Sequence, residues 1–183
     1  MRAGDAAAFT SLYERHYDDV LRYARRRVDE QTARDVAAET FLVAWRRPGQ
    51  VPDAEPLPWL YGVARNTLGN VLRSRTRAAA LGLRVRAASV AGVPMVQADH
   101  ADSVVDNVQV AQALRRLSMH DQEALQLIAW EDLDLAAAAQ VVGCSAATFA
   151  VRLHRARRRV ARLLNTPAGN PHSPFPVLET EAR

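Results

Sequence analysis

Apolar residues recur at helical spacing in the N-terminal part of the chain and predict three helices there. The first begins at Asp5 as its cap, and the other two cover residues 31–47 and 58–77. Residues three and four apart share one side of a helix, so each segment can bury an apolar stripe. The stripe of the first helix consists of Phe9, Leu12, Tyr13, His16, Val20, Leu21, Ala24 and Val28.

Two features of these helices predict burial. The run from Phe41 to Trp45 in the second helix is apolar on every side, so we expect it to be covered on more than one face. His16 lies inside the apolar stripe of the first helix, which favours a core histidine over a metal ligand.

The C-terminal part predicts four further helices. Ser103 and Ser118, each with an aspartate three residues later, are candidate caps for helices over 103–117 and 118–130. Two more helices, 135–142 and 145–164, are separated by a turn at Gly143. No segment alternates apolar and polar residues as a strand would, so the predicted fold class is all-α.

The last of these helices, residues 145–164, has two distinct faces. Its apolar seam contains Phe149, Leu153, Ala156, Val160, Leu163 and Leu164. Thr148 lies on the other side with Arg152, Arg155, Arg158, Arg159 and Arg162, whereas Arg157 lies near the apolar edge. Gly143 can end the preceding helix and Ser145 can cap this one. A helix, a tight glycine turn and a capped basic helix are typical of the helix-turn-helix, whose second helix enters the major groove.

Two other interpretations of this basic helix remain open. It could be an ordinary solvated face, although such a face usually alternates charge signs and residues 145–164 contain no acid. It could also lie on a membrane surface, but it lacks a bulky aromatic face and would not need the helix before it.

Composition changes this picture less than charge distribution does. All 24 basic residues are arginine, an excess that accompanies abundant alanine and is typical of GC-rich coding. Arginine richness alone therefore does not argue for nucleic acid. Residues 1–77 carry 13 arginines against 10 acids and residues 109–165 carry 8 against 5, whereas the segment between them is slightly acidic. The sequence therefore predicts two basic domains joined by a linker that is not basic.

The breaks in the pattern divide the chain into four parts. We expect a three-helix domain over 1–77, a flexible linker over 78–102, a helix-turn-helix domain over 103–165 and a disordered tail over 166–183. Within the first domain, the proline-rich segment from Pro48 to Pro58 predicts a stiffened surface loop without regular structure. The following helix carries Gly62, Asn66 and Asn70 among its arginines, and small residues let a backbone approach a ligand closely.

Residues that carry enzymatic or metal chemistry are not grouped in the sequence. The five histidines are scattered, Cys144 is the single cysteine, and there is no glycine-rich phosphate loop. The chain is therefore predicted to be no enzyme and to need no metal or cofactor. It shows no signal peptide and no apolar run near eighteen residues, so we expect a cytoplasmic protein without membrane insertion.

Three motifs in order resemble a known family. They are D-V-A-A-E-T-F-L-V-A-W-R from Asp35, W-L-Y-G-V-A-R-N-T-L from Trp59, and G-C-S-A-A-T-F-A-V-R-L-H-R-A-R from Gly143. Together they resemble the extracytoplasmic-function (ECF, group IV) sigma factors of bacterial RNA polymerase, from about Asp5 to Leu164. The resemblance implies a dissociable subunit that binds core polymerase and recognises promoter DNA, both double-stranded and melted.

The resemblance assigns a polymerase-docking role to the second helix. Asp35 and Glu39 match positions that dock on the clamp helices, with Phe41 packing nearby, and their spacing puts both acids on one helix face. The alternative is that they are ordinary solvent-facing acids. The polymerase flap and an anti-sigma factor are further partners that the resemblance implies.

The resemblance also assigns DNA contacts. The loop and the third helix match the reader of the minus-ten element, which holds a flipped base of the melted strand, and the candidates are Arg65, Asn66, Asn70, Arg73, Arg75 and Arg77. Trp59 is more typical of a core residue than of a stacking platform. The helix-turn-helix matches the reader of the minus-thirty-five element, and its candidates are Ser145, Thr148, Arg152, Arg155, Arg157 and Arg158.

Several positions depart from the family pattern. Ala38 stands where the family usually has glutamine, and residues 136–138 are alanines where it has a glutamate pair with an isoleucine. Ala147–Ala150 replaces a Gly-Thr-Val-Lys, which removes a basic side chain at Ala150. Two other function classes remain open beside the sigma factor. One is a stand-alone helix-turn-helix regulator, and the other is an interaction module that binds no DNA.

Overall fold

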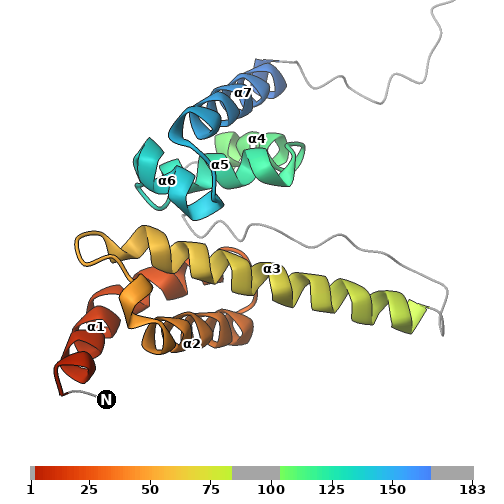
Figure 1. Ribbon diagram of the computed structural model, residues 1–183. Coiled ribbons are helices and arrows are strands. Elements are labelled where there is room, and N and C mark those ends of the chain that lie inside the picture. The colour runs from red at the N-terminus through yellow and green to blue at the C-terminus, as the bar shows by residue number, and fades with distance from the viewer. Residues whose placement is uncertain (1–2, 84–103, 166–183) are drawn as a thin grey trace, which may run out of the picture.

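The computed structural model describes residues 3–83 and 104–165, and every regular element in these ranges is helical (Figure 1). The N-terminal domain contains α1 (Ala3–Arg25), α2 (Glu30–Arg46) and α3 (Pro56–Leu83), which pack against one another. Asp29 caps α2 by accepting a hydrogen bond from the Thr32 backbone N–H at 3.0 Å. The predicted all-α fold class is confirmed.

The C-terminal domain contains α4 (Val104–Arg115), α5 (Met119–Ala129), α6 (Leu135–Val142) and α7 (Ala146–Asn165). Helix α7 packs against each of the other three helices. Ser118 caps α5, as predicted, because its hydroxyl accepts a hydrogen bond from the Asp121 N–H at 3.2 Å. Asp134 caps α6 in the same way through the Ala137 N–H at 2.7 Å.

Two predicted helix boundaries in the N-terminal domain were wrong. Helix α1 begins at Ala3, so Asp5 lies within it and does not cap it. Helix α3 runs to Leu83, six residues beyond the predicted end, because the alanines that follow Arg77 favour continued helix. The linker predicted from Ala78 therefore starts inside α3. The rest of that predicted linker and the predicted tail over 166–183 lie outside the described residues.

Three further expectations can be compared with the structure. In the run from Phe41 to Trp45, Phe41 and Ala44 are buried and Val43 and Trp45 are half-buried, whereas Leu42 is 38% exposed. The proline-rich segment contains one regular turn, the 3₁₀ helix η1 (Pro48–Gln50), because proline fits the first position of such a turn. Pro56 opens α3 for the same reason. His16 is only partly covered, and its Nδ1 lies 3.7 Å from the Asp19 carboxylate.

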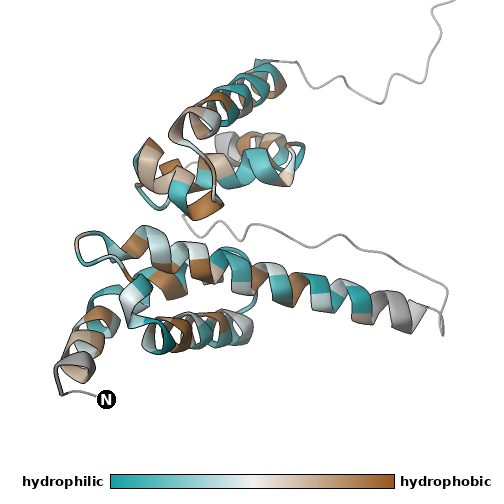
Figure 2. Cartoon of the chain, in the orientation of Figure 1, coloured by the Kyte–Doolittle hydropathy of each residue, from teal (hydrophilic) through white to brown (hydrophobic). Residues whose placement is uncertain are grey.

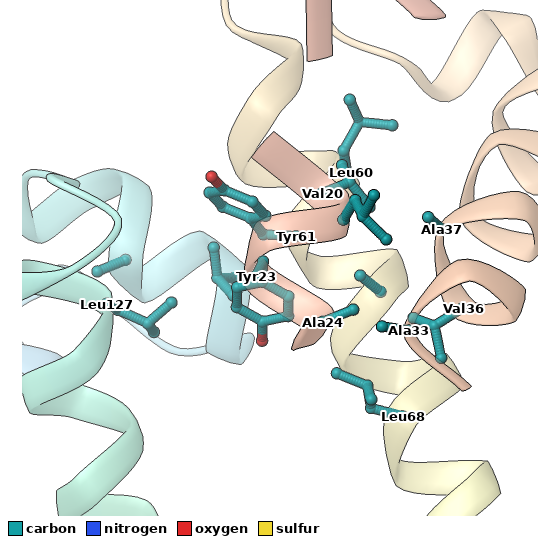
Figure 3. Close-up of a cluster of buried hydrophobic side chains, with 14 of the residues drawn as sticks. Val20, Tyr23, Ala24, Ala33, Val36, Ala37, Leu60, Tyr61, Leu68 and Leu127 are labelled. Carbon is teal, nitrogen blue, oxygen red and sulfur yellow. The ribbon is translucent and has the colours of Figure 1, made fainter. Parts of the chain in front are cut away.

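The two domains share one continuous apolar core. Val20, Tyr23, Leu60 and Tyr61 of the first domain and Leu127 of the second are fully or almost fully buried in it. Figure 3 shows Leu127 on its own helix, facing the stacked rings of Tyr23 and Tyr61, whose centroids are 4.8 Å apart. In Figure 1 the C-terminal domain lies along the first half of α3, while the second half extends past α1 and α2. The domains are therefore packed together.

No single described helix is long and apolar enough to cross a membrane. Helices α6 and α7 pass that test only as a joined pair, and they are bent by 97° at the turn between them. Along α7, polar and apolar residues alternate at helical spacing (Figure 2).

Candidate nucleic-acid interface

The turn before α7 has the geometry that the sequence predicts. Gly143 adopts φ 73°, a left-handed conformation that glycine accepts without a steric penalty, and it ends α6. The Ser145 hydroxyl accepts a hydrogen bond from the Thr148 N–H at 3.2 Å and lies 2.9 Å from the Thr148 hydroxyl. Both side chains are exposed at the start of the helix, where backbone N–H groups favour an anion such as phosphate.

The apolar seam of α7 is buried in its first three turns. Phe149, Leu153 and Ala156 are almost completely buried, whereas Leu164 is 39% exposed at the far end. The seam therefore anchors the first part of α7, and the predicted arginines project from that part: Arg155, Arg157 and Arg158 are exposed, and Arg152 is half-buried. Arg157 is exposed although it was predicted near the apolar edge. Arg159 instead donates a hydrogen bond to the Asp121 carboxylate of α5.

Four of the predicted minus-ten residues form one exposed stripe on α3. Asn66, Asn70, Arg73 and Arg77 are separated by four, three and four positions, so they follow one side of the helix. Within the stripe, the Arg73 guanidinium donates a hydrogen bond of 2.6 Å to the Asn70 side-chain oxygen. This pair presents guanidinium and amide donors to solvent.

The other two predicted minus-ten arginines are engaged elsewhere in the fold. Arg65 forms a two-point ion pair with Glu123 of α5, Nε to Oε1 at 2.6 Å and Nη2 to Oε2 at 3.0 Å. Arg75 lies off the stripe and donates hydrogen bonds to the Asp29 carboxylate at 3.0 Å and to the Thr32 hydroxyl. The structure thus brings four of the six candidates together and separates Arg65 and Arg75 from them.

The cap at Asp29 has an electrostatic consequence. Hydrogen bonds from the Thr32 backbone and hydroxyl, and then from Arg75, lower the pKa of Asp29 to about 2. Arg75 therefore has a structural partner that accounts for its position.

The small residues of α3 do allow a close approach, but the approaching backbone belongs to the protein itself. A Cβ atom at Gly62 would lie 3.7 Å from the Val141 carbonyl oxygen of α6. A cavity of about 320 Å³ lies at this contact, with Trp59 and Asn66 on one side and Gln140 and Gly143 on the other. Trp59 is half-buried, so it is neither a core residue nor a fully open stacking surface.

A second cavity, of about 540 Å³, is lined in part by other residues of the proline-rich loop. Phe9 and Arg15 of α1, Trp45 of α2 and the loop residues Val51 and Asp53 contribute to its walls. The Phe9 and Trp45 rings meet edge to face with centroids 4.8 Å apart. Residues of the loop therefore line two cavities.

The predicted polymerase-docking residues occupy both the surface and the interior of α2. Asp35 and Glu39 are exposed, and Gln31 donates a hydrogen bond to Asp35 at 3.2 Å. Phe41 is 2% exposed and packs edge to face on the Tyr13 ring at 4.9 Å between centroids. Phe41 can therefore stiffen the helix that presents the two acids, but it does not itself reach a partner.

Sequence reasoning missed an ionic cluster between the domains. Arg26 and Arg27 follow buried Tyr23 at the end of α1, and both reach Glu131, at 3.0 and 3.3 Å. These pairs join residues more than 100 positions apart, so no local pattern reveals them. The only local signal is a run of three arginines, Arg25 to Arg27, that begins two residues after the aromatic Tyr23. Among the described residues, no group of three or more His, Cys, Asp or Glu side chains could hold a metal ion.

Comparison with known proteins identifies both domains. The family model for sigma-70 region 2 matches residues 12–78, and the model for sigma-70 region 4 matches residues 107–160. The ECF sigma factor SigL of Mycobacterium tuberculosis is 32% identical over 160 residues, which span 85% of this chain and 88% of SigL. This chain belongs to the ECF family of RNA polymerase sigma factors. The family that the motifs resemble is therefore confirmed.

Other relatives and two solved structures agree. The sigma factor BldN of Streptomyces coelicolor is 33% identical over 169 residues, and the match covers 89% of this chain but only 62% of BldN. The structure of CnrH in complex with the cytosolic domain of CnrY has a TM-score of 0.59 at 26% identity, over 89% of this chain and 91% of CnrH. RpoE from Bartonella quintana, solved with the anti-sigma factor NepR, has a TM-score of 0.64 at 22% identity, over 87% and 98%. The RpoE match supports the fold.

Family membership decides between the function classes that the sequence left open. The chain is an RNA polymerase sigma factor of the ECF type, which directs promoter recognition, and the stand-alone regulator is not favoured. Members of this family are DNA-binding initiation factors, a role that fits the predicted lack of catalysis. The individual contact residues remain predictions at this stage.

Proposed function

We propose that this cytoplasmic sigma factor contacts core polymerase through α2, the minus-ten element through the loop 48–58 and α3, and the minus-thirty-five element through α7. In this role it needs no cofactor and hydrolyses no nucleotide. The energy for melting comes from capturing unpaired bases, which offsets an unpairing cost of a few kcal/mol.

The observation that carries this proposal is the exposed arginine face of α7. A seam anchored by Phe149 holds the helix, and its arginines project from a capped N-terminus on a helix without a single acid. Such a face attracts phosphate at long range and can place guanidinium groups on base edges in the major groove. We assign Arg152 and Arg155 to the groove, and Ser145 and Thr148 to phosphate.

The α3 stripe supports the minus-ten assignment. Asn66 and Asn70 can pair with the edges of unstacked bases, while Arg73 and Arg77 suit the backbone of the same strand. The proline-rich loop begins and ends beside this stripe, because Arg47, Gln50 and Pro58 line the same cavity as Asn66. A stiff loop loses little conformational entropy when it closes on a base.

The α2 surface supports docking on the polymerase clamp helices. Asp35 and Glu39 project from a helix whose Val36, Ala37 and Thr40 are buried, so the two carboxylates are held on a rigid support. Exposed Leu42 extends this surface with an apolar side chain. We assign the polymerase flap to the C-terminal domain. Because solved relatives such as CnrH are complexes of two proteins, an anti-sigma factor that covers α2 is a further proposed partner.

One transcription experiment tests these assignments together. Holoenzyme assembled from core polymerase and this protein would first select a promoter from a random duplex pool, and permanganate would then detect unpaired thymines on it. We expect the wild type to open a bubble. A variant with a glycine-serine loop in place of 48–58 should bind core polymerase normally, fail to open duplex DNA, and regain part of its activity on a pre-melted template.

The docking surface is tested in the same assay. The double variant Asp35→Arg/Glu39→Arg should lose core binding, whereas Glu14→Arg/Asp18→Arg, an exposed pair at the same spacing on α1, should retain it. Normal core binding by the first variant would refute the clamp assignment. Normal melting by the loop-replaced protein would refute base capture, and a wild type that opens no promoter with core enzyme would refute the proposed function.

A further inference from the structure

The first half of α7 offers few groups that can hydrogen-bond to a base. In a helix-turn-helix, the N-terminal residues of the second helix contact the base edges. From Ala146 to Val151 the only polar side chain is Thr148, and the arginines begin at Arg152. The Thr148 hydroxyl lies 2.9 Å from the Ser145 hydroxyl, which also accepts a hydrogen bond from the Thr148 N–H. Polar side chains therefore leave part of this end of the helix without a way to distinguish bases.

Val151 occupies the centre of the exposed side of α7. At about 100° per residue, Phe149 lies about 160° and Val160 about 180° around the helix from it, so Val151 is opposite the apolar seam. The structure agrees, because the Val151 side chain is 51% exposed while Phe149 is completely buried. A single exposed valine is ordinary on a protein surface. What distinguishes this one is its place on the helix.

The neighbours of Val151 on this side form a surface that we call the groove face. All of its members are exposed and lie within about 60° of Val151 around the helix. They are Ala147, Thr148, Val151, Arg155 and Arg158. Ala147 has only a methyl group, so it allows a close approach to a base pair, and the two arginines follow one and two turns later. Any orientation that places these arginines in the major groove therefore also places Val151 against base edges.

The chemistry of valine limits which base edge it can face. Its side chain has no donor or acceptor, so a polar base group that it covers loses water and gains no partner. Guanine, adenine and cytosine present N7, O6, N6 or N4 groups in the major groove, whereas thymine adds an apolar C5-methyl group. Thymine is therefore the base whose edge matches the Val151 side chain.

The spacing of the groove face places this thymine relative to a second base. Val151 and Arg155 are four residues apart, which is about 6 Å along the helix axis at about 1.5 Å per residue. Successive bases of one strand are about 3.4 Å apart. An arginine that contacts a base edge most often binds guanine. We therefore expect the thymine within about two base pairs of a guanine that Arg155 contacts.

We propose that Val151 is a specificity-determining residue that contacts the C5-methyl group of a thymine in the minus-thirty-five element. Ala147, one turn earlier, extends the same apolar strip. The inference rests on the proposed function of α7 and adds one residue and one base to it. The contact involves no charge and no hydrogen bond, so it distinguishes thymine from uracil, which lacks only the methyl group.

The test measures the effect of that methyl group on binding by holoenzyme. Each thymine of the minus-thirty-five element in the selected promoter is replaced singly by deoxyuridine, on either strand, which keeps the base pair and the O4 acceptor. Competition binding should show one position at which the replacement weakens binding about fourfold, the effect of leaving about one methyl group unburied. The ratio should persist at higher salt concentration, because no phosphate contact changes.

Val151→Ala is the main variant. It should bind the thymine promoter about fourfold more weakly and bind the thymine and uracil duplexes equally, so that the two changes are coupled in a double-mutant cycle. Leu164→Ala is the matched control, since Leu164 is also an exposed apolar residue of α7, 39% exposed and about 20 Å further along the helix. It should keep the fourfold ratio. Arg155→Ala should lower affinity for both duplexes and also keep the ratio.

Three results would overturn the inference. They are the absence of any uracil effect in the wild type, a full uracil effect in Val151→Ala, and a selected promoter without a thymine within two base pairs of the guanine. If no uracil has an effect but Arg155→Ala still weakens binding, this inference fails alone and the proposed function stands. A wild-type holoenzyme that selects no duplex from the pool would refute the proposed function and the inference with it.

Discussion

The two helices proposed to read DNA differ in what surrounds their polar faces. Arg155, Arg157 and Arg158 of α7 project into solvent, and the helix itself contains no acid. On α3 the stripe from Asn66 to Arg77 is exposed, but Arg65 beside it is bound to Glu123 of the other domain. The proposed reading surface of α7 is mostly exposed, whereas one arginine of the α3 surface is bound by the other domain.

This difference concerns what lies against each helix. Arg155, Arg157 and Arg158 of α7 are exposed, and Arg159 is held within its own domain by Asp121. On α3, by contrast, the backbone of α6 in the other domain lies against Gly62. The surface proposed to bind melted DNA is therefore the one that borders the interface between the domains.

The largest effect is expected from removing a buried side chain that supports the exposed arginine face of α7. Phe149→Ala deletes a completely buried ring that anchors α7, and such a cavity costs about 3–5 kcal/mol in unfolding free energy. Binding of duplex minus-thirty-five DNA should fall with it. Denaturant unfolding measures the change, and Val151→Ala, at a position 51% exposed on the same helix, should stay within about 0.5 kcal/mol of the wild type. Equal losses in both variants would show that the seam does not anchor α7.

A smaller effect is expected at Arg155 of α7, and it tests whether this side chain contacts a base. Arg155→Ala should cost about 1–3 kcal/mol of binding and relax preference at one base position, if the side chain reaches a base. Arg159→Ala is the comparison, because that arginine is held by Asp121 and points toward α5. Competition binding with duplexes altered at each position measures both variants in full-length protein. A uniform loss over all sequences would reassign Arg155 to phosphate.

The smallest effect concerns Arg75, which the structure separates from the α3 stripe. Arg75→Ala should leave affinity for single-stranded minus-ten DNA almost unchanged, while Arg73→Ala weakens it. Loss of the Arg75 hydrogen bond should also raise the pKa of Asp29 from about 2 toward its ordinary value of 3.8. A carboxyl titration followed by NMR measures this shift. An unchanged pKa, or equal losses of affinity in the two variants, would contradict the separation.

The Asp29 shift has a defined sign for stability. The folded pKa of about 2 lies below the ordinary aspartate value of 3.8, so the carboxylate stabilises the folded state above about pH 4. That contribution is lost as the pH falls from about 4 to about 2. In the Arg75→Ala variant the loss should be smaller and should be complete at a higher pH.

Local signals predicted the elements of this protein well. The cap at Ser118, the left-handed Gly143 and the seam through Phe149 depend on neighbours within four residues, and all three are present. Boundaries failed where two signals compete, as at Ala78, where small residues suggested a linker but alanine propensity extended the helix.

The candidate site was less predictable because part of it depends on distant residues. Spacing alone grouped Asn66, Asn70, Arg73 and Arg77, since a helix fixes their relation. It could not show that Arg65 meets Glu123, which lies 58 positions away, or that Arg75 returns to Asp29. The interaction across the domains depends on how they pack, and no periodic pattern in one segment encodes that packing.

Gly62 is a position at which the spacing between the two domains can be adjusted through the backbone alone. An alanine Cβ there would lie at an ordinary contact distance from Val141, whereas a longer side chain would need α6 to move away. A series of side chains of increasing size at this position would therefore change the packing of α6 on α3 without altering any charge. Such a series would separate the contribution of backbone packing at this contact from that of the ion pairs around it.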